Sequence, residues 1–176
     1  MIEILNRWWF AHKVCRKYNI TFEVLLSGDY GSFWCINADS ENPTYKIQTS
    51  IRSSNFYEIF FHELGHIIDY RRTHGCSSGR YHRYKGAHVA GTSFTGDLRQ
   101  PYKYDKMFTK DYASTVVMEA VASKYALRYL KSCGKVKPTS RGYLFDAFCT
   151  YYQQVDNIHF AEGYLMFRKY FGLEGN

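Results

Sequence analysis

The chain has 176 residues, of which 45% are hydrophobic and 19% aromatic, so it can bury a full core, and we expect one domain spanning 1–176. No apolar run reaches the roughly 18 residues of a membrane span, and the first residues mix Glu3 and Arg7 with apolar side chains, unlike a secretory leader. We therefore expect a cytoplasmic protein with no membrane partner, whose formal net charge of +7 comes entirely from the basic residues of 71–110.

The first part of the chain predicts one helix followed by a small sheet. Apolar residues recur at three- and four-residue steps over 2–18, which is the helical period. Three short runs rich in β-branched and aromatic residues follow at 20–26, 32–37 and 44–50, separated by the turn-forming stretches SGDYG and NADSENP. These runs predict a small, mostly antiparallel sheet. A Ser-Ser-Asn cluster then offers a cap for a helix over 56–72.

The second part of the chain predicts a long loop and further helices. The loop, expected over 73–110, is rich in Gly, Ser, Tyr and basic residues, shows no clear period, and is too long for an ordinary connection. Asp111 is the expected cap of a third helix, DYASTVVMEAVASKYALRYL, which ends near Gly134. Two amphipathic helices at about 141–155 and 158–171 complete a predicted α+β domain.

Two histidines and a glutamate stand within the run FFHELGHIID at 60–69. The apolar residues around them leave almost no polar face, so the helix should be buried and should carry these groups into the interior. His62 and His66 project on one side of the helix and can reach a single ion, while Glu63 leans over the remaining open position. This H-E-x-x-H spacing suits one Zn²⁺ per chain, with the carboxylate taking a proton from water at the ion. The alternative is a pair of core histidines bonded to carbonyls.

A third ligand has two candidates. The long H-E-x-x-H-x-x-G-x-x-H pattern is excluded, because Asp69 and Arg72 stand where it needs Gly and His. Glu119 is preferred, since it lies in an apolar helix whose small residues would allow a close approach opposite Gly65. Those small residues are Ala122, Ser123 and Ala126. Glu119 could instead form an ordinary ion pair, and Asp69 could serve as the ligand, as a hydrogen-bond acceptor of a ligand histidine, or as a partner of Arg72.

The two motifs together resemble those of the gluzincin metallopeptidases. HELGH is followed by E-x-x-A-x-x-Y-A, which starts at Glu119, and residues 56–130 are most similar to small bacterial and phage zincin-like domains of the ImmA/IrrE type. They are more loosely similar to the peptidase-like domain of ArdC antirestriction proteins. The resemblance implies a minimal zincin-like fold and a zinc metalloendopeptidase acting on a peptide or protein, with His62, His66 and Glu119 as ligands and Glu63 as general base.

The resemblance also implies how substrate is held, and here the chain departs from one pattern. An edge strand of the sheet would hold the substrate, and the run TYKIQTS at 44–50 is the expected strand. Thermolysin-like members place an aspartate four residues after the ligand glutamate, where this chain has Ser123. Ser123 and Asp69 are therefore the candidates to support a ligand histidine. The candidates to stabilise an oxyanion are His88, Tyr102 and Tyr104.

The basic loop suggests a second function. Tyrosines alternate there with Arg80, Arg83, Lys85 and Lys103, a composition that could contact phosphates and stack bases, or bind an acidic protein. The alternative to the peptidase is therefore a regulatory protein that uses the same scaffold to act on nucleic acid or on a nucleic-acid-processing partner, as antirestriction factors do. The intact Glu63 favours chemistry, because a purely structural zinc site does not need it.

Overall fold

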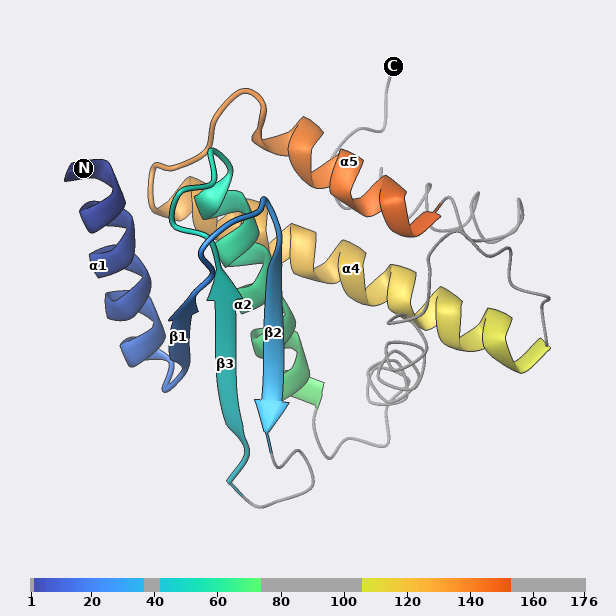
Figure 1. Ribbon diagram of the computed structural model, residues 1–176. Helices are drawn as coiled ribbons and strands as arrows, with labels where there is room; N and C mark the ends of the chain where they lie inside the picture. Colours follow the sequence, from blue (N-terminus) through green and yellow to red (C-terminus); the bar gives the residue numbers. More distant parts are fainter. Residues whose placement is uncertain (1, 37–41, 74–105, 153–176) are drawn as a thin grey trace.

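Four helices and three strands form the part of the protein that the computed structural model describes, namely residues 2–36, 42–73 and 106–152 (Figure 1). In the last range, side chains are described for 119–148. In chain order the elements are α1 (Ile2–Lys17), β1 (Thr21–Val24), β2 (Gly31–Ile36), β3 (Thr44–Thr49), α2 (Phe56–Thr73), α4 (Lys106–Ser132) and α5 (Ser140–Tyr152). None of these helices combines the length and apolar character of a membrane-crossing segment. The mixture of helices and a small sheet agrees with the predicted α+β class.

The sheet is mixed, and its strand order is β1-β3-β2. β1 runs parallel to β3 and β2 runs antiparallel to it, so that Phe22 and Phe33 both lie opposite Ile47. The prediction of a mostly antiparallel sheet is therefore wrong, because β1 and β2 are consecutive in sequence but do not pair. The expectation that 44–50 forms an edge strand is also wrong. β3 pairs with β1 on one side and β2 on the other, which places it in the centre, whereas β2 forms an edge of the described sheet. The central position agrees with the complete burial of Ile47.

Helix α2 is the centre of the core, as its apolar sequence predicts. Phe56, Phe60, Leu64 and Ile67 are all completely buried and form one stripe along the helix, and Ile59 and Phe61 are buried on either side of that stripe. The sheet and α4 cover α2 (Figure 1). Buried residues from α1, the sheet, α2, α4 and α5 join in one hydrophobic cluster, so the described elements share a single core.

The helices that follow the basic segment differ in their bounds from the prediction. α4 begins at Lys106 and not at Asp111, so the last five residues of the expected loop are helical. The sequence Lys-Met-Phe-Thr-Lys contains neither Gly nor Pro, so nothing in it prevents the helix from beginning before the Asp111 cap signal. α5 begins at Ser140, one residue earlier than expected. Residues 153–155 and the helix predicted at 158–171 lie outside the described residues.

A buried polar contact fixes the start of α5 against α2. Glu58 is completely buried in the first turn of α2, and its Oε1 accepts a hydrogen bond of 2.6 Å from the Ser140 hydroxyl. Lys137 adds an ion pair at 3.4 Å to the same carboxylate, and its backbone N–H donates to the Ser140 hydroxyl at 2.9 Å. A buried carboxylate needs such partners, since an uncompensated charge in the core is costly. The contact therefore fixes where α5 crosses α2.

Helices α2 and α4 approach each other most closely at Gly65, as the small residues predict. A Cβ at Gly65 would lie 2.6 Å from the Ala122 carbonyl oxygen and 3.0 Å from the Tyr125 Cβ. Ala122, Ser123 and Ala126 on the facing side of α4 are buried. Because side chains of this size allow two helix backbones to come close, α4 carries Glu119 directly over the His62–His66 segment of α2.

We expect Gly65→Ala to destabilise the protein although alanine is the better helix former. The helix gains about 1 kcal/mol from the change, but overpacking against a backbone oxygen that cannot move aside costs about 1–3 kcal/mol. The free energy of unfolding, measured by urea denaturation, should therefore fall by up to about 2 kcal/mol. Gly142→Ala in α5 is the matched control, because no atom of the described residues lies within 4 Å of a Cβ there, and it should leave stability unchanged or slightly raised. Equal effects at the two positions would contradict the close packing.

Candidate metal centre

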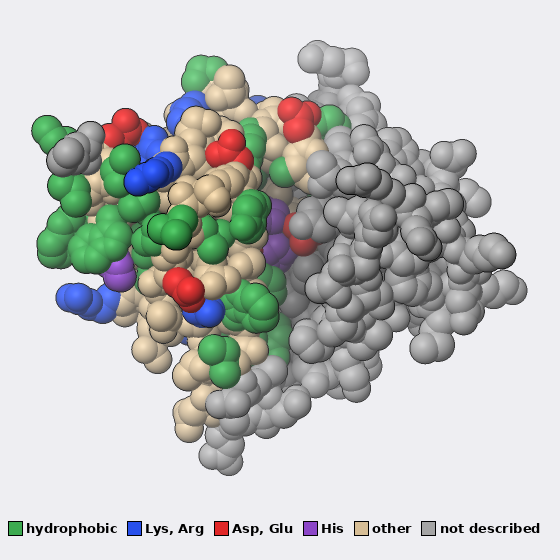
Figure 2. Space-filling model, in the orientation of Figure 1, with side chains coloured by type: hydrophobic (Ala, Val, Ile, Leu, Met, Phe, Trp, Pro, Cys, Tyr) green, Lys and Arg blue, Asp and Glu red, His purple; other side chains and the backbone are tan. Residues whose placement is uncertain are grey.

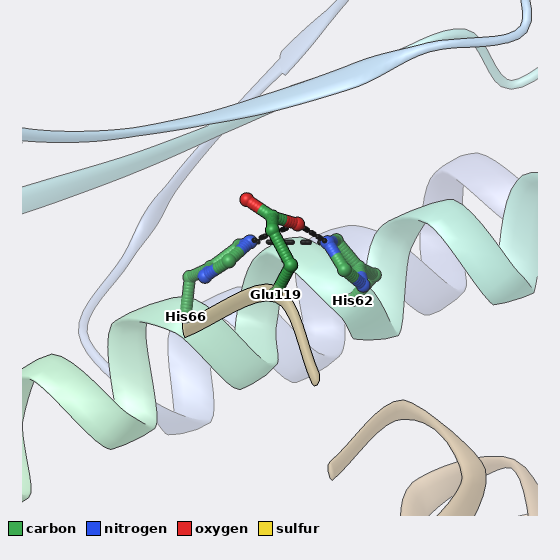
Figure 3. Close-up of side chains that lie close together, drawn as sticks. All are labelled: His62, His66 and Glu119. Carbon is green, nitrogen blue, oxygen red and sulfur yellow. Dashed lines mark hydrogen bonds and ion pairs between the residues drawn. The ribbon is translucent and has the colours of Figure 1, made fainter. Parts of the chain in front are cut away.

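Three side chains from two helices point toward one another at this contact. His62 and His66 project from α2, and Glu119 projects from α4 between them (Figure 3). The His62 Nε2 lies 2.8 Å from the Glu119 Oε2 and 3.0 Å from the His66 Nε2, and the His66 Nε2 lies 3.4 Å from the same carboxylate oxygen. Among the described residues, Glu119 thus pairs with the two histidines and not with a Lys or Arg at a helix edge, which was the alternative for this residue. The three groups form a possible metal site.

The donor set and its spacing fit a zinc ion. Two atoms that each lie about 2.0–2.1 Å from a tetrahedral zinc are about 3.3 Å apart, so the three atoms here need to separate by only a few tenths of an ångström. Two imidazoles and one carboxylate are also the three protein ligands of a catalytic zinc site that keeps a fourth position open. Among the described residues, this is the one group of three or more His, Cys, Asp or Glu side chains close enough to hold an ion.

The pKa values of Glu119 and His66 reflect mutual stabilisation of opposite charges. Burial alone would raise the pKa of Glu119, but the charge of His66 and hydrogen bonds from both histidines hold it below its ordinary value. Burial would lower the pKa of His66, but the charge and hydrogen bond of Glu119, together with the charges of Glu63 and Asp69, outweigh it, so this pKa is raised. Protons and a metal ion therefore compete for the His66 Nε2, because a histidine binds metal in its neutral form.

Each histidine ring is held by a neighbour that does not belong to the three. The Nδ1 of His62 lies 3.1 Å from the Ser123 hydroxyl, one turn beyond Glu119 on α4. This contact leaves the Nε2 of His62 directed at the Glu119 carboxylate. When the Nδ1–H donates to the hydroxyl, Nε2 is the unprotonated nitrogen that a metal ligand needs. Ser123, one of the two residues expected to support a ligand histidine, therefore contacts His62. The ring of His66 is stacked on Phe33 of β2, with centroids 4.9 Å apart.

Asp69 is buried one turn beyond His66 but is not part of the candidate ligand group. Its negative charge contributes to the raised pKa of His66, so it acts on the site electrostatically. Asp69 was also a candidate partner of Arg72. The Arg72 guanidinium instead donates a 2.7 Å hydrogen bond to the Tyr125 hydroxyl of α4. Of the two candidates for the third ligand, Glu119 and not Asp69 therefore belongs to the group that could hold an ion.

Glu63 lies between α2 and the edge strand β2. A Cβ at Gly31 would meet the Glu63 Cγ at 2.9 Å and the Ile59 Cγ2 at 2.6 Å, so glycine is what allows the strand to come this close. The carboxylate accepts a hydrogen bond from the backbone N–H of Phe33. Burial raises the pKa of Glu63, partly offset by the positive charges of His62 and His66, and the charge of Glu119 raises it further.

The site reaches the surface of the described residues. Figure 2 shows histidine and acidic side chains together at the border of the described surface. His62 keeps 15% of its side chain exposed, whereas Glu119 and His66 are buried. Seven residues predicted to act here or nearby lie outside the described residues: His88, Tyr102, Tyr104, Arg80, Arg83, Lys85 and Lys103.

The chain matched no protein family, no curated protein and no solved structure. The resemblance to gluzincins therefore stays a prediction from two motifs. The close approach of His62, His66 and Glu119 is a separate observation, made from the structure. That geometry adds Gly31 and Phe33, which the sequence did not predict as part of the site. The close spacing of a glycine and an aromatic residue in a short strand was visible in the sequence, but nothing there placed this strand against Glu63.

Replacing Glu119 by alanine should weaken zinc binding by about 100-fold or more, because two histidines alone hold the ion poorly. Asp69→Ala should cost about 10–100-fold at most, as expected for a group that acts through a ligand. Zinc content after dialysis and competition with a chromogenic chelator would measure both. An Asp69→Ala protein without zinc, together with a fully loaded Glu119→Ala protein, would assign the third ligand position to Asp69.

Ser123→Ala tests the support of His62. Loss of this hydrogen bond frees the imidazole to rotate, and zinc affinity should fall about tenfold or somewhat more. Ser132→Ala, at the exposed end of the same helix, removes a hydroxyl that among the described residues bonds the Tyr129 carbonyl and the Cys133 sulfur, and it should leave affinity unchanged. Equal affinities for the two variants would show that Ser123 does not orient His62.

Proposed function

We propose that the protein is a zinc-dependent metallopeptidase that cleaves a peptide or protein with Glu63 as general base. The observation that carries this proposal is the placement of a buried carboxylate, Glu63, beside a group of three side chains with the donor set of a catalytic zinc site. A site with a purely structural role would need a fourth protein ligand and no neighbouring base.

The residues around the centre have separable roles in this proposal. His62, His66 and Glu119 would hold the zinc, which would supply a Lewis acid and lower the pKa of water at the open position. Glu63 would accept the proton from that water and pass it to the leaving amine. Its burial favours the role, because a raised pKa brings a carboxylate closer to the range in which it both accepts and returns a proton. The Phe33 N–H keeps the carboxylate oriented during this exchange.

The edge strand β2 is the best candidate to hold the substrate. It borders the centre through Gly31 and Phe33 and ends the described sheet, whereas β3, the strand first expected in this role, has neighbours on both sides. An extended peptide that adds to this edge gains backbone hydrogen bonds irrespective of its side chains. The peptide carbonyl to be cleaved would then lie near both Glu63 and the open zinc position.

We expect Glu63→Gln to keep the metal and the fold but to lose peptidase activity by about 10²–10⁴-fold, because glutamine cannot accept the proton. The zinc-loaded chain would be incubated with a digest of denatured proteins, which offers many peptide sequences at once, and mass spectrometry would measure cleavage. Glu23→Gln is the matched control, since that exposed carboxylate on β1 pairs with Lys46 away from the site. Undiminished cleavage by Glu63→Gln would reject the proposed base, and no cleavage by the loaded wild-type chain would reject the peptidase.

A further inference from the structure

Helix α1 has an outer face that no described element covers. Ala11 and Cys15 on its inner face are buried in the core. On the opposite side Ile2, Leu5 and Trp9 are 77%, 54% and 66% exposed. Their three- and four-residue spacing places them in one line along the helix. Figure 2 shows hydrophobic side chains gathered at the left of the molecule, where Figure 1 places α1.

The same line continues as a basic surface in the second half of the helix. Trp9, His12, Lys13, Arg16 and Lys17 line a groove there. Lys13, Arg16 and Lys17 are exposed. The acidic residue of this helix, Glu3, already forms an ion pair with Arg7. The outer face is therefore apolar in its first half and positively charged in its second half.

Three large apolar side chains in one exposed line need an explanation, whereas single ones do not. An outer helix position could hold Lys, Glu or Gln without loss of helix propensity, so packing within the described domain does not require Ile2, Leu5 or Trp9. The face also lies beside β1, at the sheet edge opposite to β2 and the metal centre (Figure 1). A molecule bound to it would leave the centre accessible.

We propose that this face, consisting of Ile2, Leu5, Trp9, His12, Lys13, Arg16 and Lys17, docks an acidic amphipathic helix of a partner protein. The alternating three- and four-residue steps from residue 2 to residue 16 are those of a helix that packs along a second helix. At 1.5 Å per residue this stripe is about 20 Å long, which matches a partner helix of about four turns. The cations at its end select a partner with acidic side chains at the corresponding end.

Charge disfavours a second copy of this chain as the partner. Pairing two α1 helices would bring two sets of Lys13, Arg16 and Lys17 into one interface, and Glu3 is already engaged by Arg7. Such a dimer would gain apolar contact at one end and repulsion of like charges elsewhere. An acidic partner gains from both halves of the face.

Nucleic acid and membrane fit the layout less well. Single-stranded nucleic acid is bound by aromatic rings interleaved with cations, but Ile2 and Leu5 offer no ring for stacking. A helix that lies in a membrane surface has cations along the polar borders of its apolar face. Here the exposed cations Lys13, Arg16 and Lys17 all follow the apolar residues in sequence.

A displayed library of random 20-residue peptides, selected on the full-length wild-type chain, would test the proposal. The enriched peptides should be acidic and should carry apolar residues at three- and four-residue steps. Trp9→Ala should weaken their binding at least tenfold, as expected for an aromatic anchor, and Lys13→Glu should weaken it further as salt is lowered, through charge repulsion. Fluorescence anisotropy of a labelled, enriched peptide gives both values.

Two matched variants control for general effects. Leu26→Ala removes an apolar side chain that is even more exposed but lies outside α1, and Arg128→Glu reverses an exposed charge on α4. Both should bind the peptide like the wild type. Enriched peptides that are basic, or that bind the Trp9→Ala chain equally well, would overturn the proposal. So would Trp9-dependent binding to phosphatidylserine vesicles or to a 20-nucleotide oligothymidine without selection of any acidic peptide. None of these outcomes depends on peptidase activity.

Discussion

The backbones of α2 and α4 come together at Gly65 and Ala122, and the candidate centre depends on that contact. Glu119, Ala122 and Ser123 stand at positions i, i+3 and i+4 of α4, so they share the face that turns toward α2. Bringing Ala122 onto Gly65 therefore sets Glu119 between the two histidines and Ser123 against the His62 ring in one step. A larger side chain at Gly65 would displace ligand and support together.

The contact also places several ionisable groups in the core, where their charges need compensation. Glu63, His66, Asp69 and Glu119 are all buried within a few turns of each other. Three carboxylates in such a setting are costly unless positive charge or hydrogen bonds compensate them. The histidines supply part of this compensation, as the lowered pKa of Glu119 shows. A divalent cation held by the two histidines and Glu119 would add positive charge there, which gives a physical reason to propose one at this position.

Features that depend on neighbours along one element could be predicted from the sequence alone. An apolar run that covers nearly every face predicts a buried helix, and the four-residue spacing of His62 and His66 then fixes their common direction. Glu119 could be chosen because it lies within an apolar stretch with small residues at helical spacing, a pattern that is also local. The positions of helices and strands could be predicted from periodicity. The start of α4 could not, because the residues before the Asp111 cap signal, from Lys106 onward, can also be helical.

Which elements meet one another depends instead on the tertiary structure. The order β1-β3-β2 makes β2 the edge strand beside Glu63, and no local pattern reveals it, because strand pairing joins residues far apart in sequence. The stacking of Phe33 on His66 and the approach of Gly31 to Glu63 follow from that order. Ser123 is a similar case. A serine in a helix does not by itself indicate a partner, and the His62 ring lies within hydrogen-bond distance of it because α2 packs against α4. Local sequence selects the chemical groups, and long-range packing sets their geometry.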